Sequence, residues 1–77
     1  MKTQAIIADC PVGRDAILLD PAETYGSKRT IPEGAMVYVS MQIPYFVQVI
    51  YQSKPYIIGN TTLAEWHGND QDAIQAT

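Results

Sequence analysis

Short apolar stretches make up most of the chain, and glycine, proline, aspartate, asparagine or serine residues separate them. This spacing suits turns between strands and is typical of a small β-sandwich or β-barrel. No stretch has the length and periodicity of a long helix. The pattern predicts five strands, at Thr3 to Asp9, Ala16 to Leu19, Ala35 to Met41, Phe46 to Gln52 and Tyr56 to Ile58.

The segments between the predicted strands contain residues that allow the chain to reverse. Pro32 fixes its own φ and Gly34 tolerates a positive φ, so a turn precedes the strand that begins at Ala35. Pro55 has no N–H group to donate, and we expect it at an edge or bulge rather than inside a central ladder. The stretch from residue 20 to residue 31 is predicted to be a long loop.

The C-terminal part of the chain changes character at two points. Thr62 and Glu65 have the spacing of a capping box, so we expect one short helical turn there. After Trp66 the sequence is polar and acidic, and residues 73–77 have too few large apolar side chains to anchor them. The prediction is a single domain over residues 1–67 and a flexible acidic tail over residues 68–77.

Successive side chains of a strand point to opposite faces, so alternation divides two of the predicted strands into an inner and an outer side. The sides rich in β-branched residues are expected to line the core. These inner sides are Val37, Val39 and Met41 in one strand and Val47, Val49 and Tyr51 in the other. The outer sides then hold Met36, Tyr38, Ser40, Phe46, Gln48, Ile50 and Gln52.

The predicted outer face is apolar where a half-buried sheet is expected to be polar. It carries Met36, Tyr38, Phe46, Ile50 and Ile57. Several apolar groups on adjacent strands form a patch of the kind that marks association with another molecule. A second interpretation is that both faces are internal and that the N-terminal strand or the tail covers the outer one. Alternation alone does not separate these two interpretations.

Four stretches follow a recognisable succession of elements: Ile17 to Pro21, Thr30 to Val39, Phe46 to Ile58, and Leu63. They form an apolar strand with a proline-containing loop, a glycine-to-valine step and a hairpin, and this order resembles the bacterial SH3-like (SH3b) domain family over residues 16 to 64. Phe46 stands where the family usually has tryptophan, Tyr56-Ile57 replaces glycine-tryptophan, and the arginine-glycine-proline of the first loop is missing. The resemblance implies a strongly bent, five-stranded SH3-like barrel with one helical turn.

An SH3-like fold would bring a group of aromatic residues from loops and strand ends to one side, namely Tyr25, Tyr45, Phe46, Tyr56 and Trp66. Aromatic side chains with polar tips give a large contact area at low entropic cost, which suits a groove for a peptide or protein. Asp20 and Glu23 in the long loop would add selectivity for a basic partner. For Trp66 and Tyr51, a place at the edge of the core is the favoured alternative.

Charge and length limit the partners. The net charge is −3 and the pI is near 4.7, so the chain lacks the broad positive field that attracts nucleic acid or anionic membranes. The Lys28-Arg29 pair is expected to be a solvated loop. Small domains are usually stabilised by disulfides or a structural metal, and this chain of 77 residues has neither a set of cysteines nor a set of metal ligands. This favours an oligomer or a complex.

The N-terminus and the single cysteine indicate a cytoplasmic protein. Only the four residues from Ala5 to Ala8 form an apolar run before Asp9, too few for a signal peptide or a membrane span. Cys10 has no second cysteine to pair with, and a reduced thiol is the simplest account. An intermolecular disulfide or a reactive thiol stays open as an alternative, although no flanking Lys, Arg or His indicates a lowered pKa.

Patterns for catalysis are weak. His67, the only histidine, stands beside Gly68 in the predicted flexible tail, so a relay through it would lack a fixed base. The spacing of His, Cys, Asp and Glu makes no closed metal site, and no glycine-rich phosphate loop is present, so we expect neither metal nor cofactor. The run from Gln48 to Tyr51 loosely matches the glutamine-isoleucine-tyrosine run of a tetrameric SH3-like dihydrofolate reductase, which is the least favoured alternative.

The sequence therefore favours a non-enzymatic protein–protein interaction module, an adaptor or small inhibitor of the kind that phages and mobile elements encode. The expected partner is a protein or a second copy of the chain in a homodimer. The alternative is binding to cell-wall peptidoglycan or a peptide, as the family resemblance implies, and the missing export signal disfavours it. The expected contact residues are Tyr25, Tyr38, Tyr45, Phe46, Ile50, Tyr56, Ile57, Asp20 and Glu23.

Overall fold

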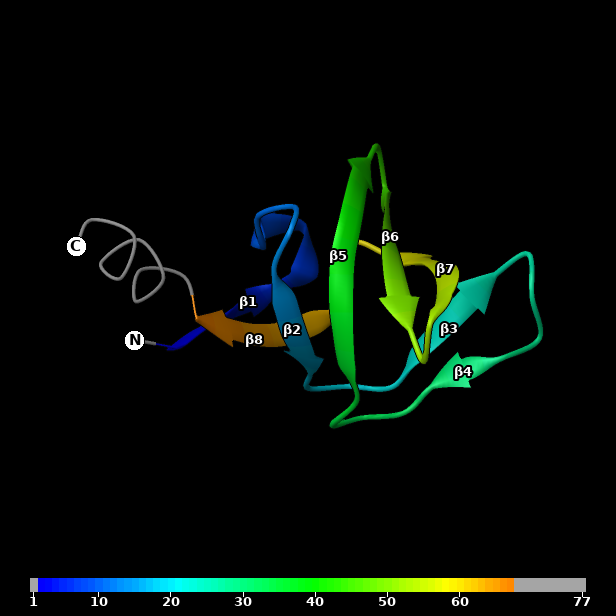
Figure 1. Cartoon of the computed structure of the whole chain (residues 1–77), viewed down its shortest axis with the longest axis horizontal. Coiled ribbons are helices and arrows are strands. Elements are labelled where there is room, and N and C mark those ends of the chain that lie inside the picture. The colour runs from blue at the N-terminus through cyan, green and yellow to red at the C-terminus, as the bar shows by residue number, and fades with distance from the viewer. Residues whose placement is uncertain (1, 68–77) are drawn as a thin grey trace.

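The computed structural model describes residues 2–67, which form one antiparallel sheet with a short 3-10 turn (Figure 1). The strands are β1 (Lys2–Ile6), β2 (Asp15–Leu18), β3 (Ala22–Tyr25), β4 (Thr30–Ile31), β5 (Met36–Ile43), β6 (Phe46–Tyr51), β7 (Lys54–Gly59) and β8 (Leu63–His67), and the turn η1 spans Ile7–Asp9. The all-β prediction is confirmed. The described part holds eight strands, however, rather than the predicted five.

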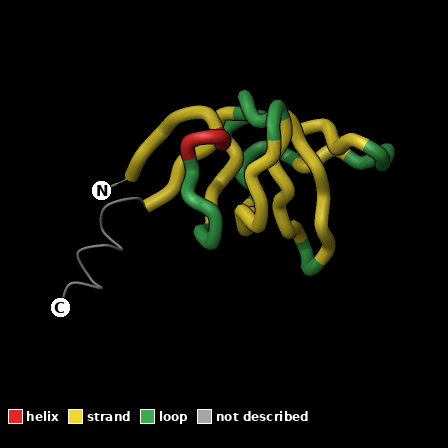
Figure 2. The backbone as a smooth tube through the Cα atoms, turned by 90° about the horizontal axis from the view of Figure 1, so that it is seen from above, coloured by secondary structure: helices red, strands yellow, loops and turns green. Residues whose placement is uncertain are grey.

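The strands follow the order β1-β8-β2-β5-β6-β7-β3-β4, and each neighbouring pair is antiparallel. β5, β6 and β7 form a meander in the middle of the sheet, and β2 lies between β5 and β8. Figure 2 shows that the sheet is curled into a half-barrel rather than flat. The curl encloses one interior, which side chains from both halves of the sheet fill.

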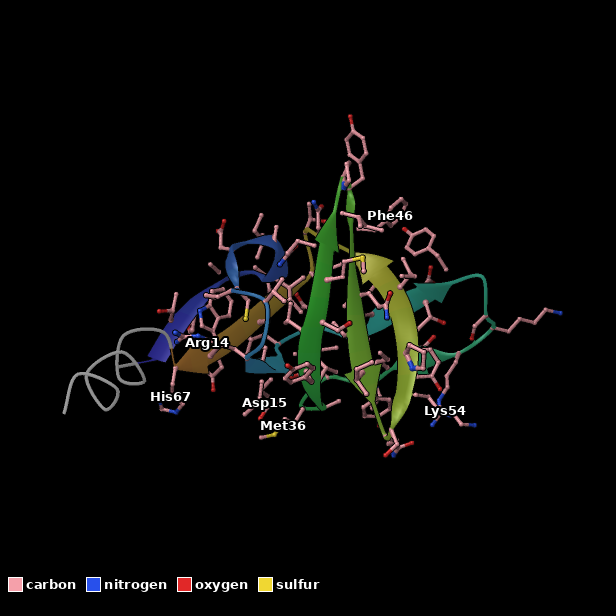
Figure 3. All side chains as sticks on the ribbon, turned by 45° about the horizontal axis from the view of Figure 1, so that its top comes forward. Arg14, Asp15, Met36, Phe46, Lys54 and His67 are labelled. Carbon is pink, nitrogen blue, oxygen red and sulfur yellow. The ribbon has the colours of Figure 1, made fainter. Side chains whose placement is uncertain are left out.

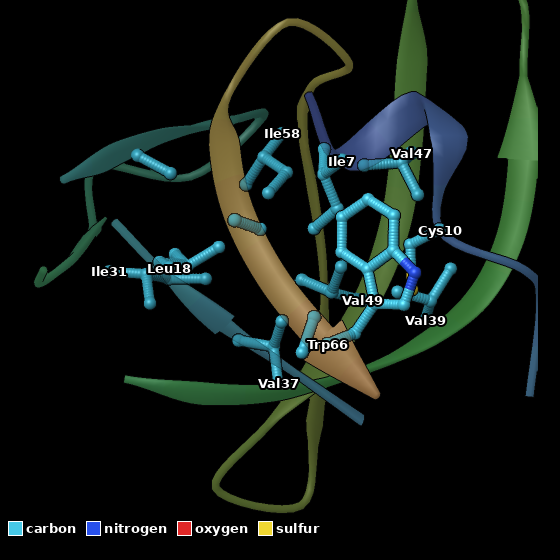
Figure 4. Close-up of a cluster of buried hydrophobic side chains, with 13 residues drawn as sticks. Ile7, Cys10, Leu18, Ile31, Val37, Val39, Val47, Val49, Ile58 and Trp66 are labelled. Carbon is cyan, nitrogen blue, oxygen red and sulfur yellow. The ribbon is translucent and has the colours of Figure 1, made fainter. Parts of the chain in front are cut away.

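Aliphatic side chains from most of the strands fill this interior. Val37, Val39, Val47 and Val49 are at most 1% exposed, which confirms the predicted inner position of these valines. Burying one such side chain contributes about 1.5–3 kcal/mol, so the cluster is the main source of stability. Its other large members, labelled in Figure 4, are Ile7, Cys10, Leu18, Ile31, Ile58 and Trp66.

Met41 lies on the side opposite to the predicted one. The pairing of β5 with β6 shifts between Val39 and Met41, so Ser40 is an extra residue that forms a bulge. The Ser40 hydroxyl donates a hydrogen bond of 3.0 Å to the carbonyl oxygen of Gln48. The extra residue reverses the alternation beyond it, and Met41 is therefore exposed.

Residues 20–31, predicted to be a loop, contain the short strands β3 and β4. These form a hairpin in which Ala22 lies opposite Ile31. Thr24 closes the hairpin, because its backbone N–H and its hydroxyl both donate to the carbonyl oxygen of Arg29. Strands of four and two residues are too short to show a clear alternating pattern, so the pairing of β3 with β7 decides the structure here.

The predicted helical turn at residues 62–65 is wrong, because Leu63–His67 forms strand β8 between β1 and β2. Ala64 and Trp66 are buried, and Glu65 between them points away from the core. Neighbouring strands on both sides supply partners for the backbone groups of β8, which a helix would have to satisfy by itself. The Thr62 hydroxyl donates to the carbonyl oxygen of Gly59 at 2.8 Å instead of capping a helix.

Three further expectations concern strand ends. The strand predicted over Thr3 to Asp9 ends at Ile6, and η1 begins at Ile7. His67 belongs to β8 and not to the predicted tail, whose residues 68–77 lie outside the described part. Pro55 lies in the half of β7 that pairs with β6 but not with β3, the edge position expected of a residue without an N–H group.

The turn η1 is tied to two strands. Ile7 is fully buried, and its N–H donates to the carbonyl oxygen of Thr62 at 2.7 Å. From β5, the side-chain amide of Gln42 donates to the carbonyl oxygens of Ile7 at 3.1 Å and Cys10 at 3.0 Å. The side chain of Gln42 thus donates a hydrogen bond to a carbonyl oxygen at the start of the turn and to another just after its end. Within residues 2–67, no helix is long and apolar enough to cross a membrane.

Replacing Gln42 with alanine is expected to lower the free energy of unfolding by about 1–3 kcal/mol, because the carbonyl oxygen of Cys10 loses its side-chain donor and that of Ile7 keeps only the N–H of Cys10. The control, Gln4→Ala, removes one exposed hydrogen bond to Glu65 and should change that free energy by less than about 0.5 kcal/mol. Urea denaturation measures both values. Equal losses for the two variants would show that Gln42 does not anchor η1.

Candidate functional site

The outer face of the central strands carries side chains in cross-strand rows. The first row, which we call the central row, crosses β2, β5, β6 and β7 through Asp15, Tyr38, Ile50 and Pro55. The second crosses β5, β6, β7 and β3 through Met41, Gln48, Ile57 and Tyr25. Met41 and Tyr38 in these rows are 49% and 45% exposed, and Met36, on β5 beside the central row, is 59% exposed.

The N-terminal strand does not cover this outer face. β1 pairs edge to edge with β8, at the end of the sheet, and β2 and β8 separate it from β5. The interpretation in which the N-terminal strand seals an internal second face is therefore wrong. The predicted outward residues Met36 and Tyr38 are exposed, and Phe46, Ile50 and Ile57 are half-buried.

A groove of about 340 Å³ opens where the β3–β4 hairpin meets β6 and β7. β3 pairs with β7 at only two positions, and the chain then turns at Gly26, whose φ of 82° suits glycine. Beyond this point, β7 has no strand beside it on the hairpin side. We call this space the hairpin groove; its lining is Tyr25, Gly26, Ser27, Gln48, Pro55, Tyr56 and Ile57.

Tyr25 is positioned by contacts on two sides. Its ring meets the ring of Phe46 edge-on, with the centroids 4.8 Å apart and the planes at 69°. Its hydroxyl oxygen lies over Gly59, 3.9 Å from where a Cβ would stand. Phe46 does not line the groove itself, but it supports the tyrosine that forms one wall.

Arg29 ties the hairpin to the turn between β6 and β7. Its guanidinium donates to the Gln52 side-chain oxygen at 2.9 Å and to the Tyr56 hydroxyl at 3.3 Å. Its Cζ atom lies 5.8 Å from the ring centroids of both Tyr51 and Tyr56, within the range of a cation–π interaction. Lys28 and Arg29 are both exposed in the loop between β3 and β4, as predicted, but no local sequence pattern reveals these contacts of Arg29.

Positive charge gathers around the hairpin groove. Lys54 directly precedes the groove residue Pro55, and Lys28 and Arg29 line a neighbouring depression of about 220 Å³. The predicted acidic contact Glu23 lines the same depression, beside these cations. Asp20 is exposed ahead of β3 and lines neither cavity. The charge here suits an acidic rather than a basic partner.

The predicted aromatic cluster is only partly assembled. Tyr25 and Tyr56 line the hairpin groove. Tyr45 is 80% exposed in the turn between β5 and β6, with a φ of 69°. Trp66 is 5% exposed, so it belongs to the core, as the favoured alternative held. Tyr51 packs against the core at its edge, with its ring centroid 6.4 Å from that of Tyr56.

Five residues of the site escaped the sequence analysis: Gly26, Ser27, Gln48, Pro55 and Arg29. Alternation places Gln48 on the outer side of its strand, but its polar side chain did not indicate contact. Pro55 precedes the predicted strand, so alternation did not assign it to a face. Ser27 and Arg29 join the site only because the hairpin folds over β7. Alternation can therefore find the floor of such a groove but not its wall.

The reactive side chains lie apart from the groove. Burial raises the pKa of the Cys10 thiol to about 11, while Arg14 lowers it by a smaller amount. The thiol is therefore protonated near neutral pH. His67 is exposed at the end of β8, and its carbonyl oxygen accepts a 2.9 Å hydrogen bond from Arg14. Within the described residues, no three His, Cys, Asp or Glu side chains form a group that could hold a metal ion.

Arg29→Ala is expected to lower the free energy of unfolding by about 1 kcal/mol, because the variant loses two hydrogen bonds and two exposed cation–π contacts. Its neighbour Lys28 provides the control, and Lys28→Ala should stay within about 0.5 kcal/mol of the wild type. Thermal and urea unfolding give both values. The proposed role of Arg29 fails if its variant is as stable as the Lys28 variant.

The raised pKa of Cys10 predicts a loss of stability at high pH. The unfolded thiol ionises near its ordinary pKa of 9.0, whereas the folded thiol ionises near about 11. The unfolded state therefore releases its proton first, and the free energy of unfolding falls as the pH rises from 9 to 11. Urea denaturation across this range should show a weaker pH dependence for Cys10→Ala. An unchanged dependence would assign the effect to other groups.

Comparison with known proteins assigns no family. No protein-family model matches the sequence, and neither a curated protein nor a solved structure matches it. The resemblance to bacterial SH3-like domains therefore stays a prediction, as does any role that it implies. Support for a function has to come from the hairpin groove and the outer face themselves.

Proposed function

We propose that the protein is a non-enzymatic interaction module, an adaptor or small inhibitor, that holds a segment of a partner protein in the hairpin groove. The observation that carries this proposal is the groove itself, whose two aromatic walls are already held in place. Phe46 supports Tyr25 on one side, and Arg29 holds Tyr56 on the other. Walls that do not have to become ordered on binding lower its entropic cost.

The lining of the groove favours binding over chemistry. It offers two phenol rings, a proline and an isoleucine for apolar contact, with Ser27 and Gln48 as hydrogen-bonding groups. No carboxylate, imidazole or thiol is among the lining residues, so the two phenol hydroxyls are the only lining side chains that could transfer a proton in catalysis. A space of about 340 Å³ is at the small end for a ligand site and suits one or two side chains of an extended segment.

We further propose that the sheet is an elaborated SH3-like barrel. In this proposal β2, β5, β6, β7 and β8 are its five strands, the β3–β4 hairpin occupies the long first loop, and β1 is an added edge strand. The support is the order of the strands, in which β2 pairs with both β5 and β8 and the next three strands form a meander. The hairpin groove then lies beside the first loop of the barrel.

Filling the groove tests the proposed function. Peptides selected from a random phage-displayed library on the immobilised full chain should bind it, and Gln48→Trp should weaken their binding at least tenfold because the indole occupies the groove. Thr61→Trp adds the same side chain in an exposed turn outside the groove and should change the affinity less than twofold. Fluorescence anisotropy measures the affinities.

Circular dichroism and urea denaturation should show both tryptophan variants to be folded. The proposal is contradicted if the library yields no specific peptide, or if the selected peptides bind the Gln48→Trp variant as tightly as the wild type. Equal weakening by Thr61→Trp would also contradict it, because the effect would not then depend on the groove.

A further inference from the structure

We propose that a second hollow on the outer side of the sheet binds the side chain of an arginine from a protein partner. This hollow has a volume of about 260 Å³ and lies where β8 and β5 flank β2. It shares no lining residue with the hairpin groove. We call it the acidic pocket; its lining is Asp15, Ile17, Met36, Glu65, Trp66 and His67.

The register of three strands builds the acidic pocket. Ile17, half-buried on β2, lies opposite Glu65 on β8 and opposite Met36 on β5. Asp15 is two residues from Ile17 on the same strand, so both side chains point to one side. The residue between them is buried, which places this side away from the core. Ile17 therefore forms an apolar floor between the longer side chains of Glu65 and Met36.

The charge at the acidic pocket is negative. Within the described residues, its lining has two carboxylates and neither lysine nor arginine. Asp15 and Glu65 are diagonal neighbours on adjacent strands, a relation that places them about 7–8 Å apart. The side-chain amide of Gln4 donates to Oε2 of Glu65 at 2.9 Å and orients this carboxylate. Figure 3 shows Asp15 and His67 in the same part of the molecule and Lys54 far from them.

Arg14 is the cation beside this site, and it does not cancel the two carboxylates. It lines a separate depression with Asp15 and His67, where its guanidinium donates to the carbonyl oxygen of His67 at 2.9 Å. Its charge also acts on the buried thiol of Cys10. One guanidinium against two carboxylates leaves the described part of the site acidic. A cationic occupant is therefore favoured.

Arginine fits an apolar floor with carboxylates at its rim. Its methylene stem packs on Ile17 and Met36, and its planar guanidinium has five N–H donors that can reach two separated carboxylates. The ammonium of lysine is more strongly hydrated and loses more on partial burial. The volume lies below the range of roughly 300–1,000 Å³ of small-molecule sites and suits one side chain. Asp20 and Glu23, expected from the sequence to select a basic partner, do not line this pocket.

Short peptides test the acidic pocket directly. Acetyl-Gly-Gly-Arg-Gly-Gly-amide is titrated into the isotope-labelled full chain, and NMR follows the backbone amides. The shifts should saturate and concentrate at β2, at β8 and at the start of β5. The same peptide with citrulline, the uncharged isostere of arginine, should bind about fivefold more weakly because two ion pairs are lost. A lysine peptide should bind at least twofold more weakly. Equal affinity of either replacement, or shifts centred elsewhere, would overturn the proposal.

Removing the two charges identifies the residues that bind arginine. Asp15→Asn and Glu65→Gln should each weaken the arginine peptide about threefold, and the double variant should bind the arginine and citrulline peptides equally. Glu33→Gln makes the same change in charge at an exposed turn outside the pocket and should leave the affinity within twofold of the wild type. A double variant that still prefers arginine to citrulline would contradict the assignment.

A tethered cation gives a second test that leaves both carboxylates in place. Met36→Lys places an ammonium in the wall of the pocket and should weaken the arginine peptide at least tenfold. Met41→Lys makes the same change at another exposed position of β5, outside the pocket, and should change the affinity less than twofold. Circular dichroism and urea denaturation should show both variants to be folded. Equal weakening by the two lysines, or full binding by Met36→Lys, would count against the pocket.

The acidic pocket and the hairpin groove are separable, so this inference does not depend on the proposed function. Gln48→Trp fills the groove and should leave binding of the arginine peptide unchanged. Library peptides that Gln48→Trp weakens should still bind the Met36→Lys variant. Arginine binding at the pocket without any groove peptide would contradict only the proposed function. Groove peptides without arginine binding at the pocket would contradict only this inference.

Discussion

The inward packing of four valines from β5 and β6 is the contact on which the rest of the structure depends. Val37 and Val39 on one strand and Val47 and Val49 on the next are fully buried. Because side chains alternate along a strand, burying these four residues turns the residues between them outward. The apolar side chain of Tyr38 is exposed for this reason. Shifting either strand by one residue would cover the outer face only by exposing the valines.

The β3–β4 hairpin converts this sheet into a possible binding site. It pairs with β7 at two positions only and then leaves it, so a groove stays open between them. Arg29 reaches past the gap to Gln52 and Tyr56 and holds the far side of the hairpin in place. The hairpin is attached to β7 at one end and through Arg29 at the other, so the groove has a fixed shape. A strand that continued to pair with β7 would close the groove, and a free loop would leave its shape undefined.

The hairpin groove and the central row differ in shape. The groove is a small hollow near three cations, and a single extended segment can enter it. The central row crosses four strands through Asp15, Tyr38, Ile50 and Pro55, and the Tyr38 side chain in it is exposed. A chain of 77 residues buries a limited core, so a partner bound in the groove would add a large fraction to its stability.

The sequence by itself determined the all-β class, the inner valines of β5 and β6 and the favoured burial of Trp66, because these follow from alternation and residue type along a single strand. Only the tertiary structure decided the rest, because it depends on contacts between distant segments. Ser40 is an extra residue in the pairing of β5 with β6, and this bulge reverses the side of Met41. β8 is a strand because β1 and β2 flank it, and the groove exists because the hairpin folds over β7.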